Sequence, residues 1–315
     1  MDAASGTVLL RTAHSVYVLR VDRPTGSVRH VHWGAPLPLT DAVVLPLWAE
    51  HDNSFAGRWD GVEEFPVDGG ARFGVPALEV RFADGSSPLE PTVEDIVLLR
   101  DDHVVIHLRD RSRPLSWQLH YQVPAGGDVL ERWTEFEHTG TDADGDIMLL
   151  RYASAHWPLP QRPGWRIGSV HGGWSAEGRL ERSGLPVGET TLGSRRGHTG
   201  HHANPWATLD AGDADEEHGE VWTVALAASG SWRLTAQRTP AGRTGVVAGR
   251  GTRAPSCGSL RATATAQRSP SPCTPRTASV VRAGPSTATC VSTSCRVRGS
   301  CGRCSTTPGR PPPSR

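Results

Sequence analysis

Apolar and polar residues alternate along most of residues 1–250, which is the period of β-strands that bury one face. Turn signals rich in Gly, Asp and Pro separate the alternating segments, and no window of a dozen residues shows a helical period. The clearest segments are Thr7–Arg11, Ser15–Val21, Ser27–Trp33, Leu78–Phe82, His103–Leu108, Ser116–Val123 and Val129–Phe136. The pattern predicts an all-β fold, built as an antiparallel sandwich of many strands.

Alternation is plainest between Asp128 and His138, where Glu131, Glu135 and Glu137 share one face of the predicted strand. Three acids that alternate on a strand are typical of a solvent-exposed face. Two neighbouring carboxylates are also the catalytic pair of a glycosidase, so Glu131 and Glu135 are candidates for that role. The sequence leaves both interpretations open.

Two shorter segments carry local predictions. Glu63 and Glu64 precede a Phe-Pro pair in a predicted loop, where they need not take part in chemistry. The segment Gly219–Gln237 is predicted to form a hairpin whose turn is Ala228–Gly230.

Charge is distributed unevenly along the chain, although 33 basic and 33 acidic residues give a formal net charge of zero. Every acidic residue lies at or before Glu220, whereas the segment from Thr252 onward holds ten arginines and no acid. That segment also contains all six cysteines and no Phe, Tyr or Trp, so its composition cannot bury a core. We therefore predict a folded domain over residues 1–250 and a disordered tail over residues 251–315.

The composition of the tail is what a GC-rich gene yields when it is read out of frame. Synonymous codons for Cys301–Arg315 can be regrouped to encode RPVLYNSWEATAFS, which restores aromatic and acidic residues. We therefore interpret the tail as frameshifted, with the shift near Gly249–Ser256. The alternative is a basic disordered tail that binds nucleic acid, but no aromatic residues are interleaved with its charges, so we expect no nucleic-acid partner.

The N-terminus indicates the compartment. It has neither a positively charged leader nor an apolar run long enough for a signal peptide or a membrane span, and residues 1–256 contain no cysteine. A cytoplasmic location without a membrane partner is the resulting expectation.

Groups able to bind a polar ligand are densest between His171 and Trp206. Two glycines precede Trp174, and they allow backbone angles that carry an indole outward on a loop, where it can stack on the face of a sugar. Most of the 11 tryptophans of a β protein are instead expected to pack inside it. Binding and packing therefore both remain open for Trp174.

Three histidines of the same stretch invite a zinc interpretation: His198, His201 and His202. Their spacing fits no common zinc pattern, and Arg195 and Arg196 would repel the metal. We expect these histidines to be hydrogen-bonding loop residues, and we predict no metal and no cofactor.

Several short segments occur in a characteristic order: HWG at His32–Gly34, EEFP at Glu63–Pro66, HGGW at His171–Trp174, SRRG at Ser194–Gly197 and HHANPW at His201–Trp206. Together they resemble the N-terminal β-supersandwich domain of family 36 glycoside hydrolases, the bacterial α-galactosidases. The regrouped tail resembles the link from that domain into the catalytic barrel of the family.

The resemblance implies a large antiparallel β-supersandwich in an enzyme that hydrolyses terminal α-linked galactose, as in melibiose and raffinose, with retention. In the family both catalytic aspartates lie in the barrel that follows. We therefore assign no catalytic residue here, and we expect the chain to be truncated before the barrel and inactive alone. Family members take α-galactoside sugars and are typically homotetramers.

The resemblance also implies two substrate-binding residues. In the family an Asp and a Trp of the N-terminal domain reach a substrate pocket; the Trp matches Trp174, and the Asp matches Asp52 at the start of DNSF. In that role Trp174 would pack on the sugar ring while the Asp52 carboxylate accepts hydrogen bonds from hydroxyls.

Three functions follow as hypotheses. The chain is the non-catalytic N-terminal domain of an α-galactosidase, a stand-alone carbohydrate-binding β-sandwich, or a sandwich glycosidase that uses the strand carboxylates Glu131 and Glu135. We prefer the first, because it alone accounts for the tail.

Overall fold

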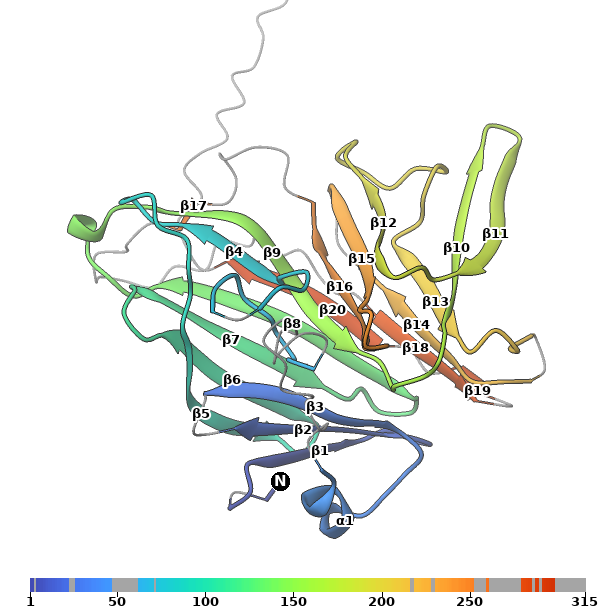
Figure 1. Ribbon diagram of the computed structural model, residues 1–315, viewed down its shortest axis with the longest axis horizontal. Coiled ribbons are helices and arrows are strands. Elements are labelled where there is room, and N and C mark those ends of the chain that lie inside the picture. Colours follow the sequence, from blue (N-terminus) through green and yellow to red (C-terminus); the bar gives the residue numbers. More distant parts are fainter. Residues whose placement is uncertain are drawn as a thin grey trace, which may run out of the picture.

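The computed structural model describes residues 1–2, 4–22, 26–46, 62–70, 72–215, 218–227 and 230–251, with the strands at 259–260, 279–284, 287–288 and 291–297 of the C-terminal segment. The described strands form three sheets (Figure 1). The smallest contains β1 (Thr7–Arg11), β2 (Val16–Asp22) and β3 (Ser27–Gly34), which pair antiparallel in that order. The all-β class predicted from the alternation is therefore confirmed, but the detail differs, because the strands divide among three sheets.

The largest sheet has the strand order β11-β10-β13-β14-β18-β20-β8-β7-β6-β5, with β19 beside β18. Its strands are β5 (Pro91–Arg100), β6 (His103–Asp110), β7 (Leu115–Gln122), β8 (Val129–His138), β10 (Arg166–Gly173), β11 (Ala176–Gly184), β13 (Trp206–Asp210), β14 (Val221–Ala225), β18 (Ser279–Gly284), β19 (Thr287–Ala288) and β20 (Val291–Val297). The antiparallel hairpins β5–β6, β6–β7 and β7–β8 arise directly from the alternating segments.

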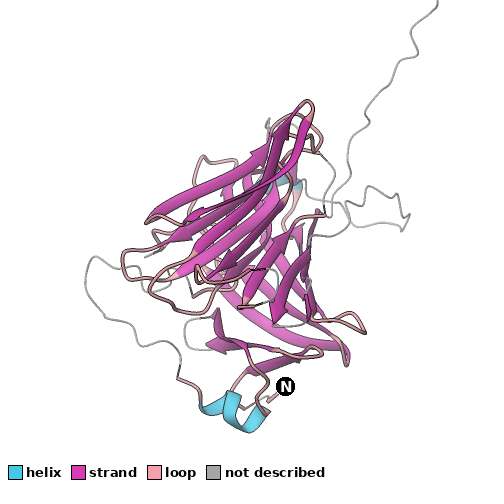
Figure 2. Cartoon of the chain, turned by 90° about the vertical axis from the view of Figure 1, so that its right-hand side faces the viewer, coloured by secondary structure: helices cyan, strands magenta, loops and turns pink. Residues whose placement is uncertain are grey.

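The third sheet has the order β12-β15-β16-β9-β17, with β4 also paired to β9. Its strands are β4 (Leu78–Arg81), β9 (Ile147–Pro158), β12 (Gly188–Ser194), β15 (Trp232–Arg238), β16 (Thr244–Arg250) and β17 (Ser259–Leu260); a short 3-10 helix, η1 (Asp142–Asp144), precedes β9. Figure 2 shows the strand layers of the molecule from the side.

The hairpin predicted over Gly219–Gln237 is wrong. β14 pairs with β13 and β18 in the largest sheet, whereas β15 pairs with β12 and β16 in the third sheet. The connection between β14 and β15 therefore crosses from one sheet to the other. A local turn signal marks the end of a strand but does not choose the edge on which the next strand pairs.

Four short strands are described within residues 251–315, for which the composition predicts disorder, and β18 and β20 are the longest of them. Together β18 and β20 lie between β14 and β8 in the largest sheet, and β20 runs parallel to β8. Ser279–Gly284 and Val291–Val297 each contain two Val residues and no Pro, which suits them to a strand. The rest of the predicted tail beyond residue 251 lies outside the described residues.

One apolar core is shared by the three sheets. It includes Trp33 of β3, Trp157 of β9 and Trp222 of β14, whose rings lie 5.7 Å (Trp33 to Trp157) and 6.5 Å (Trp33 to Trp222) apart between centroids. These tryptophans are almost fully buried, as expected for the packing residues of a β protein. The core thus ties residues far apart in the sequence into one unit.

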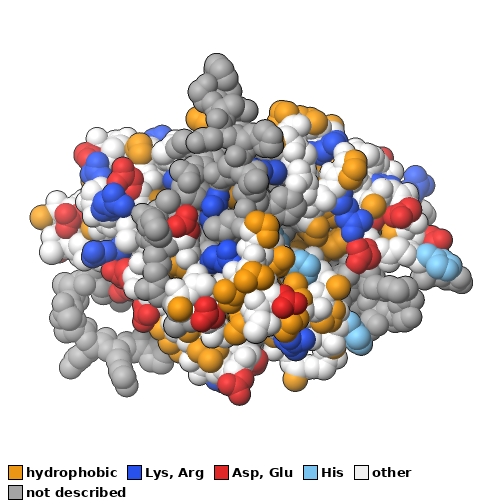
Figure 3. Space-filling model, turned by 60° about the horizontal axis from the view of Figure 1, so that its bottom comes forward, with side chains coloured by type: hydrophobic (Ala, Val, Ile, Leu, Met, Phe, Trp, Pro, Cys, Tyr) orange, Lys and Arg blue, Asp and Glu red, His pale blue; other side chains and the backbone are white. Residues whose placement is uncertain are grey.

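The short helix α1 (Leu39–Val44) covers the outer face of the β1–β3 sheet. Ala42 packs there in a small apolar cluster with Val16, Val18 and Val31, and hydrophobic side chains gather on this face in Figure 3. The Arg20 guanidinium fixes the end of the helix, because Nη2 donates hydrogen bonds to the carbonyl oxygens of Ala42 and Val43 at 2.8 and 2.9 Å. None of the helices in the described part of the chain is long and apolar enough to cross a membrane.

Candidate functional site

Trp174 lies in the two-residue turn between β10 and β11 and is 90% exposed. Ser175, the other turn residue, has a φ of 61°. Gly172 is required before the turn, because a Cβ atom there would lie 2.7 Å from the Cα of Glu177 on the opposite strand. The hairpin projects from the rest of its sheet (Figure 1), so the indole faces solvent at the end of an arm.

A contact between two side chains links the strands of this hairpin. His171 on β10 and Glu181 on β11 lie on opposite strands, and the imidazole Nε2 is 2.5 Å from a carboxylate oxygen of Glu181. Glu177 accepts a hydrogen bond from the backbone N–H of Ser175 at 3.1 Å. The first contact links the two strands below the turn, and the second fixes the turn itself, so both help to orient Trp174.

Asp52, the second predicted substrate-binding residue, lies outside the described residues. Its predicted role is not tested by the geometry. Of the two predicted binding residues, the structure therefore places only Trp174.

The predicted loop histidines lie between β12 and β13. His198, His201 and His202 are all exposed, and the rings of His201 and His202 are 4.2 Å apart between centroids. Within the described residues no group of three His, Cys, Asp or Glu side chains has the geometry to hold a metal ion.

The three carboxylates of β8 do not share one environment. Glu137 is exposed, Glu131 is partly buried, and Glu135 is only 3% exposed, with Nε2 of His120 3.8 Å from its carboxylate. Burial raises the pKa of Glu131. The prediction of a uniformly solvated face is therefore wrong for Glu135, because packing on this face of the sheet removes its side chain from water.

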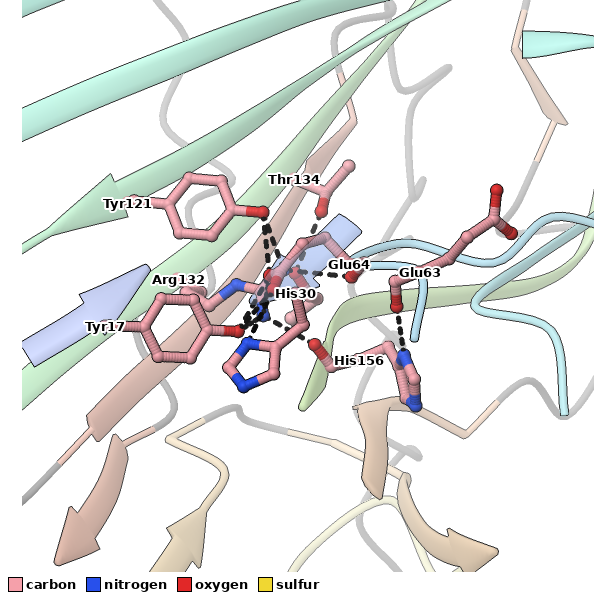
Figure 4. Close-up of polar contacts among 9 residues, drawn as sticks. Tyr17, His30, Glu63, Glu64, Tyr121, Arg132, Thr134 and His156 are labelled. Carbon is pink, nitrogen blue, oxygen red and sulfur yellow. Dashed lines mark hydrogen bonds and ion pairs between the residues drawn. The ribbon is translucent and has the colours of Figure 1, made fainter. Parts of the chain in front are cut away.

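A buried polar network lies where β2, β7, β8 and β9 meet the segment after residue 61 (Figure 4). Its centre is the ion pair between Glu64 and Arg132, with 2.8 Å between a guanidinium nitrogen and a carboxylate oxygen and less than 3% exposure of either side chain. The Tyr17 hydroxyl donates to the Glu64 carboxylate at 2.7 Å, and the Tyr121 hydroxyl donates to it at 3.1 Å. His30 Nδ1 lies 3.2 Å from the same carboxylate.

Arg132 also satisfies backbone groups of two other segments. It donates hydrogen bonds to the carbonyl oxygens of Glu64 and His156 at 3.0 and 2.5 Å. Its guanidinium lies 4.6 Å from the ring centroid of Trp157, within the range of a cation–π contact. One side chain thus joins β8 to β9 and to the segment after residue 61.

The pKa shifts within the network show which of its side chains are charged. Burial alone would raise the pKa of Glu64, but Arg132, with help from His30 and Tyr17, holds that pKa below its usual value. Burial raises the pKa of both Tyr17 and Tyr121 far above the usual range, so both hydroxyls stay protonated and donate. Because Glu64 and Arg132 are almost inaccessible to water, the network can stabilise the fold but cannot meet a substrate.

His156 is a buried neutral histidine at the edge of this network. Its Nδ1–H donates to the Glu63 carbonyl oxygen at 2.6 Å, and Glu63 itself is paired with Arg72. Burial lowers the pKa of His156 to about 4, although the bond to Glu63 and the charge of Glu64 oppose this shift. The folded protein therefore excludes a proton from His156 at neutral and mildly acidic pH.

We expect the free energy of unfolding to fall by about 3 kcal/mol between pH 6.5 and pH 4 because of His156 alone. In this window the unfolded chain protonates His156 and the folded chain does not, so protons favour unfolding; the contribution is complete above pH 6.5. Glu64, with a lowered pKa, loses its contribution only below its unfolded value of about 4.5.

Urea unfolding across this pH range, on the wild type and on His156→Gln, measures the effect. The glutamine amide can still donate to the Glu63 carbonyl but does not titrate, so the pH slope should be shallower by about one proton. Equal slopes for the two proteins would contradict the assignment.

A family model described as "Glycosyl hydrolase family 36 N-terminal domain" matches residues 26–261 of the chain. The probable alpha-galactosidase G of Aspergillus terreus is 26% identical over 263 residues, which cover 76% of this chain and 35% of that protein. Alpha-galactosidase AgaA of Geobacillus stearothermophilus is 27% identical over 253 residues, which cover 71% of this chain and 34% of that protein. The chain thus spans about a third of the length of the curated relatives it matches.

Solved structures agree with these matches. A variant of AgaA from G. stearothermophilus in complex with stachyose has a TM-score of 0.69 and 25% identity, covering 78% of this chain and 37% of that chain. The galactosidase domain of AgaSK has a TM-score of 0.70 at 23% identity, covering 79% of this chain and 38% of that chain, which shows the shared fold.

Proposed function

The chain belongs to the glycosyl hydrolase family 36 N-terminal domain family, and we propose that it serves as the sugar-contacting, non-catalytic part of an α-galactosidase. Relatives of known structure were captured with stachyose and raffinose, both of which are galactosides. The proposed ligand is accordingly a terminal α-linked galactose. The homo-oligomeric assembly, the cytoplasmic location and the frameshifted tail stay predictions.

One observation carries the proposal, namely the exposure of Trp174. A residue that is 90% exposed contributes little to packing. An indole at the tip of a hairpin whose strands are linked by the His171–Glu181 contact instead presents a flat apolar face to solvent. The C–H face of galactose is apolar and matches it. In this role the indole stacks on the sugar ring, and Asp52 accepts hydrogen bonds from the hydroxyls.

We expect Trp174→Ala to weaken raffinose binding about tenfold while changing the free energy of unfolding by less than about 0.5 kcal/mol. Isothermal titration with raffinose and urea unfolding measure the two effects. Val187→Ala is the matched control, because Val187 is also an exposed apolar residue, at 55%, outside the β10–β11 hairpin. Unchanged raffinose affinity in Trp174→Ala, or an equal loss in Val187→Ala, would overturn the proposal.

A further inference from the structure

Five side chains that can carry positive charge lie close together between β12 and β13. We call them the basic loop: Arg195, Arg196, His198, His201 and His202. All five are exposed, and within the described part of the chain none of them forms an ion pair with a carboxylate. A cationic cluster without its own acids favours an anionic ligand.

The backbone that carries the two arginines is fixed by hydrogen bonds. The Ser194 hydroxyl donates to the carbonyl oxygen of His198 at 2.7 Å, and it accepts the N–H of Arg196 at 3.4 Å. The N–H of Gly197, whose φ is 80°, donates to the Ser231 hydroxyl at 3.2 Å. Arg195 and Arg196 therefore project from an ordered turn, so less backbone conformational entropy is lost when they bind a ligand.

The cations are also close enough to influence one another. Loss of hydration beside neighbouring atoms lowers the pKa of His202, and the charges of Arg196 and His201 lower it further. This mutual repulsion is relieved when an anion binds among them.

The basic loop lies beside the strand that carries Trp174. β13, which follows the loop, pairs with β10 at Ser169 and Ala207, and the N–H of Asn204 donates to the Val170 carbonyl at 3.1 Å. Figure 1 shows the β12–β13 connection next to β10, on the side of the molecule where the hairpin projects. His201 and His202 thus lie in the turn just before Asn204, whose partner Val170 is four residues before Trp174.

The charges of the hairpin balance one another, because Glu177 and Glu181 are matched by Arg179 and Arg182, and all four side chains are exposed on β11. The arginines of the basic loop therefore supply the net positive charge at this end of the molecule. The surface around Trp174 therefore combines an aromatic face with an excess of cations.

We propose that the basic loop binds the acidic group of a sugar whose ring stacks on Trp174. The ligands of this surface then include acidic saccharides such as galacturonate. The inference rests on the sugar-binding role proposed for Trp174. Guanidinium groups suit this ligand, because their planar donors match the two oxygens of a carboxylate. Phosphate oxygens offer the same chemistry, so a phosphorylated sugar is the second member of the class.

Titration calorimetry on the full chain at pH 7 and low ionic strength tests the proposal with galactose, galacturonate, galactose 6-phosphate and inorganic phosphate as ligands. Galactose and galacturonate differ only at C6, so their affinity ratio isolates the charge. We expect one or both acidic sugars to bind about fivefold more tightly than galactose, and this preference to shrink in 0.5 M salt. The two acidic sugars show whether carboxylate or phosphate is preferred.

The double variant Arg195→Gln/Arg196→Gln should reduce the preference for acidic sugars to about onefold while leaving galactose affinity unchanged. Arg81→Gln/Arg111→Gln is the matched control, because it removes two exposed arginines elsewhere on the surface. Equal affinities for galactose and the acidic sugars in the wild type overturn the inference, and so does a preference that survives in the first variant.

Two results separate this inference from the proposed function. If galactose binds but the acidic sugars bind no more tightly than galactose, the proposed role of Trp174 stands and the anion site is overturned. A second result would overturn the acidic saccharide as the ligand. If inorganic phosphate competes fully with galacturonate, and Trp174→Ala leaves galacturonate affinity unchanged, the basic loop binds simple anions without any help from the indole.

Discussion

Glu64→Gln is expected to lower the free energy of unfolding by about 3–5 kcal/mol. The glutamine has nearly the same shape, but it leaves the Arg132 guanidinium buried without a counter-charge. It also offers one oxygen where the carboxylate offers two to Tyr17 and Tyr121. Urea unfolding followed by circular dichroism measures the loss.

Glu94→Gln is the matched control for this change. Glu94 also pairs with an arginine, Arg109, at 3.0 Å, but 45% of the Glu94 side chain and 60% of the Arg109 side chain are exposed. Its loss is expected to cost about 1 kcal/mol or less, because water screens the exposed pair. Similar effects for Glu64→Gln and Glu94→Gln would refute a central role for the buried pair.

The double variant Glu64→Gln/Arg132→Met probes the coupling directly. Removing both charges deletes the uncompensated guanidinium, so the double variant should be more stable than the sum of the single losses predicts. Additive losses would show that the two residues act independently. If the single variants do not fold, the stability of the double variant still separates these outcomes.

Gly245→Ala is expected to destabilise the domain by about 1–3 kcal/mol through overpacking. A methyl group on Gly245 of β16 would overlap the imidazole of His156 and would lie 3.0 Å from its Cε1 atom. The ring cannot swing aside freely, because it is buried and bonded through Nδ1 to the Glu63 carbonyl. Thermal unfolding of the variant reports the cost.

Gly184→Ala at the end of β11 serves as the comparison, because an added Cβ there meets no atom within 4 Å and the backbone angle is ordinary. We expect it to be close to neutral. The double variant Gly245→Ala/His156→Ala removes the ring that the new methyl group overlaps. A positive coupling between these two changes would identify the overlap as the cause, and its absence would point to a backbone effect.

Alternation predicted more of the interior than the turn signals did. It places Arg132 on the face of β8 that also carries Leu130 and Phe136, and a charge on an apolar face signals a buried ion pair. The partner could not be predicted in the same way, since Glu64 lies in a segment without strand alternation, where two acids before Phe-Pro indicated only a loop. Local pattern identifies a buried charge but not the distant residue that compensates it.

Trp174 illustrates the opposite limit. The two glycines before it allow an exposed indole, and the indole is exposed in the structure. The contact between His171 and Glu181 could not be predicted from the sequence, because it depends on a cross-strand register that residue order alone does not determine. The same reason explains why β14 and β15 were paired with each other in the prediction and lie in different sheets in the structure.

The buried network also has a consequence for the order of events during synthesis. Its hydrogen bonds join Tyr17 to Glu64 across 47 residues, Arg132 to the Glu64 carbonyl across 68, and Arg132 to Tyr17 across 115. Contacts of such long range make folding slow, because chain entropy is lost before the contacts form. A ribosome adds roughly 5–20 residues per second, so Tyr17 waits on the order of 10 s for Arg132 to emerge. During that interval Tyr17 and Glu64 are already synthesised, but the guanidinium that compensates the Glu64 carboxylate is not, so the first strands wait without their buried ion pair.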